Sequence, residues 1–312
     1  MEGFDKIVVV TRKTRLEGLM ERFVTAAQAK FYIEHAGGDF SEYREEHDTY
    51  MRSREQVLRA LDMVLKLQVI DRGLVPTYLF ASRDIVVTIG QDGLVANTAK
   101  YVAGQPIVAV NPDPGRIDGV LLPFRPQDAR GEIERILKGR AHLRKVTLAE
   151  AQLNDGQRLL AFNDLFIGAS SHVSARYHIR WRGKKEPHSS SGVIVSTGAG
   201  STGWLSSLFT MTRGIAAFLG GESPGGITMT WDEERLIFVV REPFVSRHSK
   251  ADTVAGILER AEVLELESLM PSGGVIFSDG IEADYLAFNA GALVRVKAAE
   301  QSACLAAREA GR

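Results

Sequence analysis

The chain has 312 residues, of which 45% are hydrophobic and 25% are charged. These fractions are ordinary for a folded globular protein, and the length suits two domains or one large α/β unit with an insertion. Lys and Arg number 38 and Asp and Glu number 39, so the net charge is −1. This balance argues against binding to nucleic acid or to an anionic membrane through overall charge, and any anion must be bound by a local site.

The same composition limits the compartment and the metal chemistry. A single cysteine, Cys304, excludes an internal disulfide and a Cys-based zinc site. No apolar run approaches the roughly 20 residues of a membrane span. The N-terminal residues Met1 to Lys6 lead directly into Ile7–Val10 and carry neither a signal sequence nor an Arg-rich presequence. We therefore expect a cytoplasmic protein with no membrane partner.

The first 125 or so residues alternate between strand and helix patterns. Short β-branched or apolar runs predict strands, and apolar residues at helical spacing predict helices. The expected elements are a strand at Ile7–Thr11, helices at Thr14–Glu34 and Tyr50–Leu67, strands at Leu67–Ile70 and Asp84–Ile89, a helix at Leu94–Val102 and a strand at Pro106–Val110. This alternation predicts a doubly wound parallel sheet with helices on both faces.

After the turn-rich segment Asn111–Gly115 the pattern changes to many strands with short connections, and Trp204–Leu219 is the one clear helix. We predict strands at Lys145–Leu148, Arg158–Phe162, Asp164–Ile167, Tyr177–Trp181, Gly192–Ser196, Glu234–Val240, Glu262–Leu266, Gly274–Ser278 and Leu293–Lys297. Such a series is typical of an all-β, sandwich-like domain. The basic segment Arg182–Ser191 is interpreted as a solvated hairpin tip.

These patterns divide the chain into two domains. We expect an α/β nucleotide-binding domain at residues 1–124 and a β-rich, dinucleotide-binding domain at 125–297. The Ala-rich, amphipathic segment 298–312 is expected to pack back on the first domain. The predicted fold class is therefore α/β followed by all-β.

Three loops leave the carboxyl ends of the predicted parallel strands, where ligands of open α/β sheets bind. The first, Thr11–Arg15, is cationic, and the third contains Asn111. The second, Gly90-Gln91-Asp92-Gly93, places a carboxylate between two glycines, whose N–H groups can approach a phosphate closely. An ordinary tight turn remains an alternative for the Gly-rich loop.

A second Gly-rich segment follows the predicted strand Gly192–Ser196 and precedes the helix that begins near Trp204. Its Gly198, Gly200 and Gly203 match the G-x-G-x-x-G dinucleotide pattern, yet no βαβ unit continues from it, which disfavours an oxidoreductase. Thr197, Ser201 and Thr202 could donate hydrogen bonds to a nucleotide there, or could simply cap the helix.

Two further polar pairs interrupt the β domain. Asn163 and Asp164 follow Phe162 within an apolar run, and Asp279 and Gly280 follow the strand Gly274–Ser278. Buried polar groups need partners, so each pair either binds a ligand or makes a local turn.

Taken in chain order, these residues resemble the NAD kinase family, and most closely its mitochondrial-type branch and bacterial relatives. The family carries Gly-Gly-Asp-Gly-Thr, then Asn-Glu, then Thr-x-x-Gly-Ser-Thr, then a late Asp-Gly. This chain has Gly90–Leu94, Asn163-Asp164, Thr197–Gly203 and Asp279-Gly280. The resemblance extends from about Ile7 to Lys297.

The resemblance implies transfer of a phosphoryl group from ATP, with Mg²⁺, to the 2′-hydroxyl of the adenosine ribose of NAD, which gives NADP. Asp92 would be the general base or the carboxylate that orients the hydroxyl, and Mg²⁺ would be held through the phosphates, with Asp92 as a further ligand. The expected phosphate-binding residues are Gly90, Gly93, Arg12, Lys13 and Asn111, and the expected NAD-binding residues are Asn163, Asp164, Thr197, Ser201, Thr202 and Ser207. The partners implied are small-molecule nucleotides and a second copy of the chain in a homodimer.

Four positions depart from the family pattern. Gln91 replaces a glycine, Leu94 replaces a threonine, Asp164 replaces a glutamate, and Ser191 stands where many bacterial members have aspartate. The first two lie on the donor side, which predicts retained NAD binding with weakened catalysis. Alternatives are a non-catalytic NAD(P)-binding relative and a lipid or sugar kinase of the same superfamily.

Overall fold

The computed structural model describes residues 3–62, 64–221 and 225–308, and these form two compact units. The first unit contains residues 1–144 and 304–312, and the second contains residues 145–303. No helix in the described part of the chain is long and apolar enough to cross a membrane. The strand β16 (Leu293–Ala307) passes from the second unit into the first.

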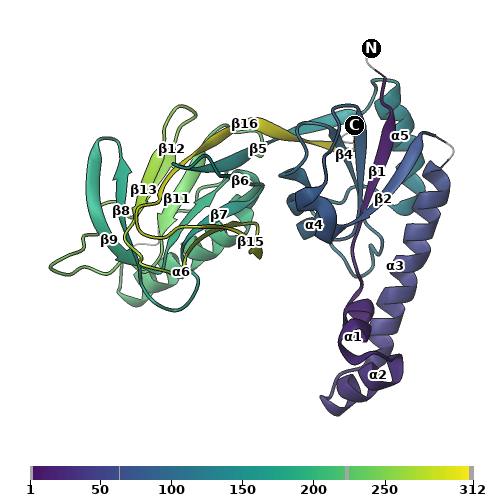
Figure 1. Ribbon diagram of the computed structural model, residues 1–312, viewed down its shortest axis with the longest axis horizontal. Coiled ribbons are helices and arrows are strands. Elements are labelled where there is room, and N and C mark those ends of the chain that lie inside the picture. Colours follow the sequence, from purple (N-terminus) through teal and green to yellow (C-terminus); the bar gives the residue numbers. More distant parts are fainter. Residues whose placement is uncertain (1–2, 63, 222–224, 309–312) are drawn as a thin grey trace. The chain divides into compact units, whose positions relative to one another are not determined.

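The first unit is an α/β fold around a parallel sheet (Figure 1). Its elements are β1 (Lys6–Thr11), α1 (Arg15–Phe23), α2 (Ala26–His35), α3 (Phe40–Leu61), β2 (Lys66–Asp71), η1 (Arg72–Thr77), β3 (Asp84–Ile89), α4 (Asp92–Ala99), β4 (Pro106–Val110), η2 (Pro126–Asp128) and α5 (Ala129–Leu137). The strand order is β2-β1-β3-β4, all parallel, and Cys304 and Leu305 of β16 add a parallel pairing beside β4. The predicted doubly wound sheet is confirmed.

Helices cover both faces of this sheet. Val57 of α3 and Ile133 of α5 pack with alternate residues of the strands, such as Ile7 and Val87, in one core. Helix α4 lies on the opposite side of the sheet (Figure 1). Right-handed crossovers require this arrangement, because β1 to β2 and β3 to β4 step in opposite directions across the sheet.

The second unit consists of two antiparallel sheets. Its elements are β5 (His142–Leu153), β6 (Arg158–Ala161), β7 (Asp164–Ala169), β8 (Ala175–Trp181), β9 (Lys184–Ser190), β10 (Val193–Ser196), η3 (Ala199–Thr202), α6 (Trp204–Phe218), β11 (Leu236–Val240), β12 (Ala255–Leu258), β13 (Leu264–Ser268), β14 (Gly274–Ser278), β15 (Ile281–Ala287) and β16. One sheet has the order β16-β13-β8-β9, with β5 beside β16 and β6 beside β5. The other has the order β12-β11-β10-β7-β14-β15.

Alternating side chains of the six-stranded sheet face two different cores. Leu165, Ile167 and Val195 point to the core between the sheets, whereas Phe166 and Ile194 pack with Leu208 of α6 on the other side. This period-2 pattern is the one expected of a sandwich whose outer face is covered by a helix.

Four local expectations are corrected. The helix expected at Thr14–Glu34 is two helices, because Val24 adopts a left-handed backbone (φ 65°) and Thr25 caps α2. Helix α3 begins at Phe40, well before Tyr50, with Asp39 as its N-cap. Residues 184–190, taken for a hairpin tip, form the edge strand β9. Strand β16, predicted to end at Lys297, continues to Ala307, and from Cys304 onward it belongs to the first unit, as expected for this segment. Residues 309–312 lie outside the described residues.

The division between the units lies at 144/145, whereas the sequence pattern placed it at 124/125. The difference comes from α5, an amphipathic helix that is absent from the elements predicted from the sequence. Ile133 and Ile136 of this helix are buried with Val108 and Val110 of β4, so residues 125–144 pack with the first unit.

Removing the buried hydroxyl of Tyr50 should destabilise the first unit. Tyr50, 2% exposed, accepts a hydrogen bond from Arg12 N (2.9 Å) and donates one to Ile89 O (3.2 Å). Tyr50→Phe leaves both main-chain groups unsatisfied and should lower the free energy of unfolding by about 1–3 kcal/mol in urea titrations. Tyr43→Phe, whose hydroxyl has no hydrogen bond within the described chain, should change it by less than about 0.5 kcal/mol. Equal effects of the two substitutions would contradict this role of Tyr50.

Candidate functional site

The predicted phosphate loops of the first unit share one edge of the sheet. Strands β1, β3 and β4 are parallel, so Arg12, Gly90 and Asn111 follow their carboxyl ends side by side. Gly90 N donates to Val110 O (3.3 Å), and a Cβ placed on Gly90 would lie 3.5 Å from Arg12 Cδ. The structure therefore brings these three sequence-predicted residues together.

Asp92 is held by the loop that follows β4. As the first residue of α4, it is half-buried, and its Oδ1 and Oδ2 accept hydrogen bonds from Leu121 N (2.9 Å) and Val120 N (3.0 Å). These two bonds fix the orientation of the carboxylate. Each oxygen keeps a further lone pair, so the group can still accept a hydrogen bond from a hydroxyl or bind a cation.

The backbone of the Gly-rich loop does not require glycine at position 91. Gln91 is exposed and has an extended conformation (φ −107°, ψ 168°) that any residue adopts. Gly93 is exposed with open space around it, whereas a Cβ on Gly90 would approach Leu94 Cδ2 to 2.8 Å. Leu94, 4% exposed, thus fills the space under Gly90.

Asn111 stabilises its own loop. Its Nδ2 donates to Ile117 O (2.8 Å), and its Oδ1 accepts from Asp113 N (3.0 Å). The side chain is 5% exposed and both of its polar atoms have partners. Any phosphate contact from this loop would therefore come from residues other than Asn111. The role of Asn111 is to hold the loop in its conformation.

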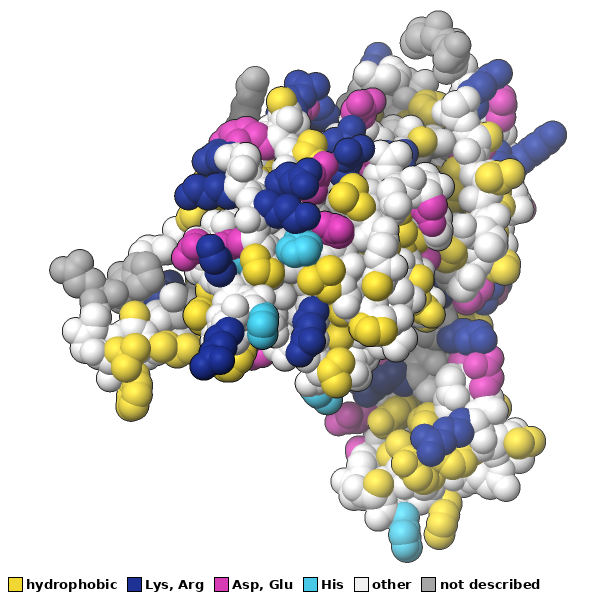
Figure 2. Space-filling model, turned by 60° about the vertical axis from the view of Figure 1, so that its left-hand side comes forward, with side chains coloured by type: hydrophobic (Ala, Val, Ile, Leu, Met, Phe, Trp, Pro, Cys, Tyr) yellow, Lys and Arg dark blue, Asp and Glu magenta, His cyan; other side chains and the backbone are white. Residues whose placement is uncertain are grey.

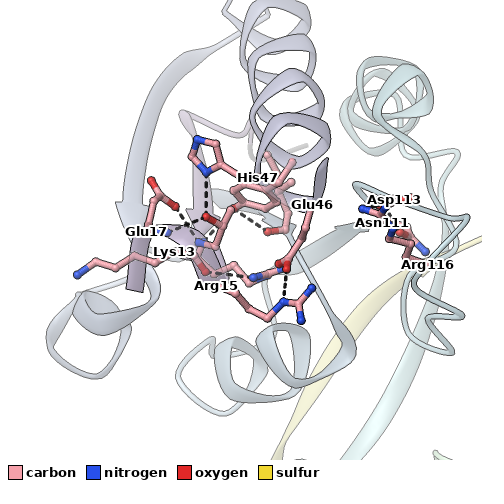
Figure 3. Close-up of polar contacts among 12 residues, drawn as sticks. Lys13, Arg15, Glu17, Glu46, His47, Asn111, Asp113 and Arg116 are labelled. Carbon is pink, nitrogen blue, oxygen red and sulfur yellow. Dashed lines mark hydrogen bonds and ion pairs between the residues drawn. The ribbon is translucent and has the colours of Figure 1, made fainter. Parts of the chain in front are cut away.

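The cationic loop after β1 is tied to helix α3 (Figure 3). Arg12 Nη2 donates to Glu46 Oε1 (3.1 Å), Arg15 also contacts Glu46, and Thr14 Oγ1 hydrogen-bonds His47 Nδ1 (2.9 Å). Lys13 pairs with Glu21 (2.6 Å), and both side chains are more than half exposed. Arg12 is thus a largely buried cation with fixed partners, and Lys13 is a surface cation paired with Glu21.

Sequence reasoning missed the residues of α3 that hold these loops. Tyr50 bridges Arg12 N and Ile89 O, and Ser53 Oγ donates to Pro112 O (2.7 Å). Glu46, Tyr50 and Ser53 are spaced by four and three residues, which places them on one face of the helix. That spacing was the available signal, since polar residues on an apolar helix face need buried partners.

In the second unit, Asp279 organises the predicted Asn-Asp pair. Its backbone is left-handed (φ 53°), and its carboxylate accepts from Phe162 N (3.0 Å) and Asn163 N (2.6 Å). Asp279 N donates to Asp164 O (3.0 Å). The late Asp-Gly turn and the Asn-Asp pair thus form one cluster.

Asp164 is a buried carboxylate without a hydrogen-bond donor. The residue is 8% exposed, and its carboxylate accepts no hydrogen bond from any residue that the structure describes. Burial, with a smaller contribution from the nearby Asp279, raises the pKa of Asp164 from 3.8 to about 7. The half-buried carboxamide of Asn163 likewise has no partner in the described ranges. These two side chains are available to a ligand.

The glycines of the G-x-G-x-x-G match have a packing role. A Cβ on Gly198 would lie 1.9 Å from Thr230 O, and one on Gly200 would lie 2.2 Å from Asn163 O. Glycine is required at both positions because the main chain of another segment occupies the space of a side chain. The match to the dinucleotide pattern therefore follows from close backbone packing.

The hydroxyls of this segment fall into two groups. Thr197 Oγ1 donates to Phe162 O (2.6 Å) and accepts from Gly200 N (3.2 Å), and Ser201 Oγ donates to Gly198 O (2.7 Å). Both side chains are buried and hold the loop against Asn163. Thr202 and Ser207 are exposed, so their hydroxyls are accessible from solvent.

A cavity of about 900 Å³ lies on the α6 side of the six-stranded sheet, and its lining includes Ser191. Phe166 stacks between Phe277 (centroids 4.8 Å apart) and Trp204 (6.0 Å), and the Arg241 guanidinium lies 5.6 Å from the Trp204 ring centre. Such a wall of stacked rings can hold a planar aromatic ring.

Surface charge does not form a single-sign patch on the face that Figure 2 shows, where Lys and Arg alternate with Asp and Glu. Exposed cross-strand pairs of the β16-β13-β8-β9 sheet illustrate the mixture. Glu265 contacts Arg180 (3.1 Å) and Arg295 (2.9 Å), and Glu267 contacts Lys185 (2.8 Å).

The similarity of this chain to known proteins lies in its three-dimensional structure. No protein-family model matches the chain, and no curated protein matches it. An NAD kinase from Archaeoglobus fulgidus in complex with ATP is similar with a TM-score of 0.58 and 15% identity, over 97% of this chain and 94% of that one. Yeast NADH kinase complexed with NADH is similar with a TM-score of 0.60 and 16% identity, over 99% and 85%. The chain has the NAD kinase fold over almost its entire length.

A methyl group at Gly200 should disrupt the loop that supports Asn163. Gly200→Ala forces its Cβ against Asn163 O and should lower the free energy of unfolding by about 1–3 kcal/mol, measured by urea titration. Gly214→Ala, within α6 and with no atom near its added Cβ, is the control and should be neutral or slightly stabilising. Similar losses in both variants would contradict the packing role of Gly200.

The buried Asp164 should make stability depend on pH. Because its pKa is about 7 in the folded chain and 3.8 as a reference, the folded state binds the proton more tightly. The free energy of unfolding should therefore fall, by on the order of a few kcal/mol, as pH rises from about 4 to about 7, and then level off. Asp164→Asn should remove this component in urea titrations at pH 5 and 8. Parallel pH curves for the variant and the wild type would refute the assignment.

Proposed function

We propose that this protein is a phosphotransferase acting on an NAD-type dinucleotide: an NAD kinase that transfers a phosphoryl group from ATP to the 2′-hydroxyl of the adenosine ribose and forms NADP. The observation that carries the proposal is the Asn163–Asp164 pair, a half-buried carboxamide beside a buried carboxylate, whose side chains have no hydrogen-bond partners in the described chain. The near full-length likeness to an NAD kinase and an NADH kinase supports it. A fold hosts many functions, so the site residues must decide.

The Asn163–Asp164 pair suits the sugar and base of a dinucleotide. The hydroxyls of a ribose can donate hydrogen bonds, and the Asp164 carboxylate receives no hydrogen bond from the described chain. The Asn163 carboxamide can both donate and accept, as recognition of a purine edge requires. The exposed hydroxyls of Thr202 and Ser207 are the further contacts we assign to the dinucleotide, while Thr197 and Ser201 hold the loop.

Asp92 is the residue that we assign to the reacting hydroxyl. Its carboxylate is fixed by two N–H donors and keeps one acceptor position on each oxygen. In phosphoryl transfer the protein chiefly aligns the reactants and stabilises charge. A carboxylate held in this way can orient the 2′-hydroxyl and accept its proton. The Gly90 and Gly93 backbone, Arg12 and Lys13 would bind the donor phosphates.

Magnesium fits this arrangement only as a partner of the phosphates. Among the described residues no three His, Cys, Asp or Glu side chains cluster as a metal site. Asp92 has acceptor positions for a cation, and Mg²⁺ commonly takes one or two carboxylates together with phosphate oxygens. When bound, the ion neutralises phosphate charge, while Asp92 and the Gly-rich loop determine where the hydroxyl and phosphates lie.

A non-catalytic NAD(P)-binding relative is the second candidate, and two positions favour it. Gln91 adds a side chain beside the phosphate loop, and the buried Leu94 brings no hydroxyl to it. The extended backbone at Gln91 creates no strain, so its effect would be local crowding of the donor phosphates. We therefore propose slow catalysis with ATP and retained dinucleotide binding.

The kinase assay follows NADP formation from NAD, ATP and Mg²⁺. Wild-type protein should form NADP, and Asp92→Asn should lower kcat at least about a hundredfold because the base and its charge are lost. The Kd for NAD should stay within a few fold, since Asp164 is intact. Asp118→Asn, an exposed carboxylate in the loop next to Asp92's partners, is the matched control and should keep kcat.

Two results separate the candidates. Gln91→Gly should raise kcat if crowding of the donor limits the rate. If wild type and Gln91→Gly both bind NAD but form no NADP with any nucleoside triphosphate or polyphosphate, the kinase proposal is wrong and the non-catalytic relative is favoured. If neither binds NAD, both candidates fail.

A further inference from the structure

Arg12 is an unusual cation for a loop at the edge of a sheet. Its side chain is only 10% exposed and lies against the Tyr50 ring, with 5.1 Å between the guanidinium carbon and the ring centre. Nη1 donates to Lys13 O (3.1 Å) and Nη2 to Glu46 Oε1 (3.1 Å). Its Nε is buried without a partner in the described chain. A buried guanidinium with an unused donor is incomplete without a further acceptor.

Glu46 joins this arginine to a second one. Its side chain is 14% exposed and accepts from Arg12 through Oε1 and from Arg15 through Oε2. Burial raises the pKa of Glu46, but the hydrogen bonds from Arg15 and Arg12 outweigh burial and lower it overall. Two guanidinium groups and one carboxylate leave the trio with one excess positive charge.

Arg12 connects this trio to the Gly-rich loop. A Cβ on Gly90 would be 3.5 Å from Arg12 Cδ, so the arginine stem runs along that loop. Tyr50, one helical turn after Glu46, bonds both Arg12 N and Ile89 O, and so fixes the distance between the two loops. Half of the Arg15 side chain is exposed, which leaves its guanidinium reachable from solvent.

We propose that Glu46 is a positioning residue for the phosphoryl donor. By bonding both guanidinium groups it holds Arg12 against the Gly90 loop and Arg15 next to Arg12, so that a polyphosphate meets two oriented guanidinium groups. The inference rests on the proposed function for the identity of the donor as a nucleoside triphosphate. In this proposal Glu46 affects the affinity for the phosphoryl donor, and not the affinity for NAD. It acts through Arg12 and Arg15 and does not contact the donor itself.

If Glu46 instead competed with the donor for Arg12, replacing Glu46 would change the Kd of the donor in the opposite direction. A carboxylate near a phosphate repels it, so a Glu46 that merely occupied Arg12 until the donor arrived would weaken binding, and its removal would tighten it. Positioning predicts the reverse, because a guanidinium deprived of its buried partner turns toward water and loses its orientation. The direction of the change in Kd therefore decides between the two roles.

The test measures the Kd of Mg-ATP, of inorganic tripolyphosphate and of NAD by calorimetry on the full chain. Glu46→Gln should weaken ATP and tripolyphosphate about tenfold, near 1.4 kcal/mol, and leave NAD within twofold. Glu45→Gln is the matched control, because Glu45 is the neighbouring residue, is 65% exposed and, among the described residues, forms its one ion pair with Arg116 on the surface. It should leave all three values within twofold.

A double-mutant cycle shows whether Glu46 acts through Arg12. If it does, Glu46→Gln should weaken ATP binding less in an Arg12→Ala background than in the wild-type chain, with the remaining loss acting through Arg15, whereas fully additive losses would show independent roles. Glu46→Asp keeps the charge but shortens the side chain by one methylene, and should also raise the KM for ATP without changing the KM for NAD. This variant carries the test if Glu46→Gln fails to fold.

Several results would overturn the proposal: unchanged or tighter ATP binding in Glu46→Gln, an equal loss in Glu45→Gln, additive losses in the cycle, or wild-type donor binding in Glu46→Asp. Failure of the proposed function gives a different result. In that case no NADP forms in any variant, while the tripolyphosphate Kd still reports on Glu46.

Discussion

The hydroxyl of Tyr50 is the interaction on which the first unit's site depends. It accepts from the main chain that leaves β1 and donates to the end of β3, and Ser53, on the same face of α3, bonds the main chain after β4. One helix therefore fixes three adjacent strand ends at once. Parallel strands bring loops to a common edge, but only such side-chain bonds fix the loops relative to one another. The positions of Arg12 and Gly90 follow from this constraint.

In the second unit a carboxylate, that of Asp279, holds a loop in place through main-chain hydrogen bonds. Asp279, in a left-handed turn, bonds the main-chain N–H groups of Phe162 and Asn163, which stops β6 from running directly into β7. That break leaves Asp164 buried beside a second carboxylate, with its pKa raised to about 7. An uncompensated buried acid is costly for stability, and perturbed groups of this kind concentrate at functional sites. In our proposal the dinucleotide supplies the missing donors.

The sequence predicted those strands and helices whose own residues show a clear apolar pattern. The β-branched runs at Asp84–Ile89 and Pro106–Val110 match β3 and β4 because fully buried parallel strands are apolar throughout. Strand β9 was missed because its buried residues, Glu186 and His188, are polar and depend on partners from a distant loop, such as Thr253 N to Glu186 Oε1 (2.6 Å). The break at Val24 was equally hidden, since a β-branched residue seldom adopts positive φ.

In the candidate site, too, the residue types could be read from the sequence, whereas their contacts could not. The residue types at Gly90–Gly93 and at Asn163-Asp164 left a ligand site and a local turn as alternatives, and the partners of these residues lie far along the chain. The main-chain donors of Val120 and Leu121 to Asp92, and the pairing of Glu46 with Arg12, arise only from the tertiary fold. Sequence likewise gave no means of separating the hydroxyls that hold the Gly-rich loop from those open to solvent.

The most direct test of the account is the number of protons released when NAD binds, obtained by calorimetry at pH 7 in buffers of different ionisation enthalpy. Burial raises the pKa of Asp164 to about 7, so this carboxyl is partly protonated in the free protein at pH 7, and hydrogen bonds from a bound ribose would lower that pKa. The account predicts net release of protons when NAD binds, and loss of that release in Asp164→Asn. Binding of NAD without proton release, or the same release in the variant, would contradict it.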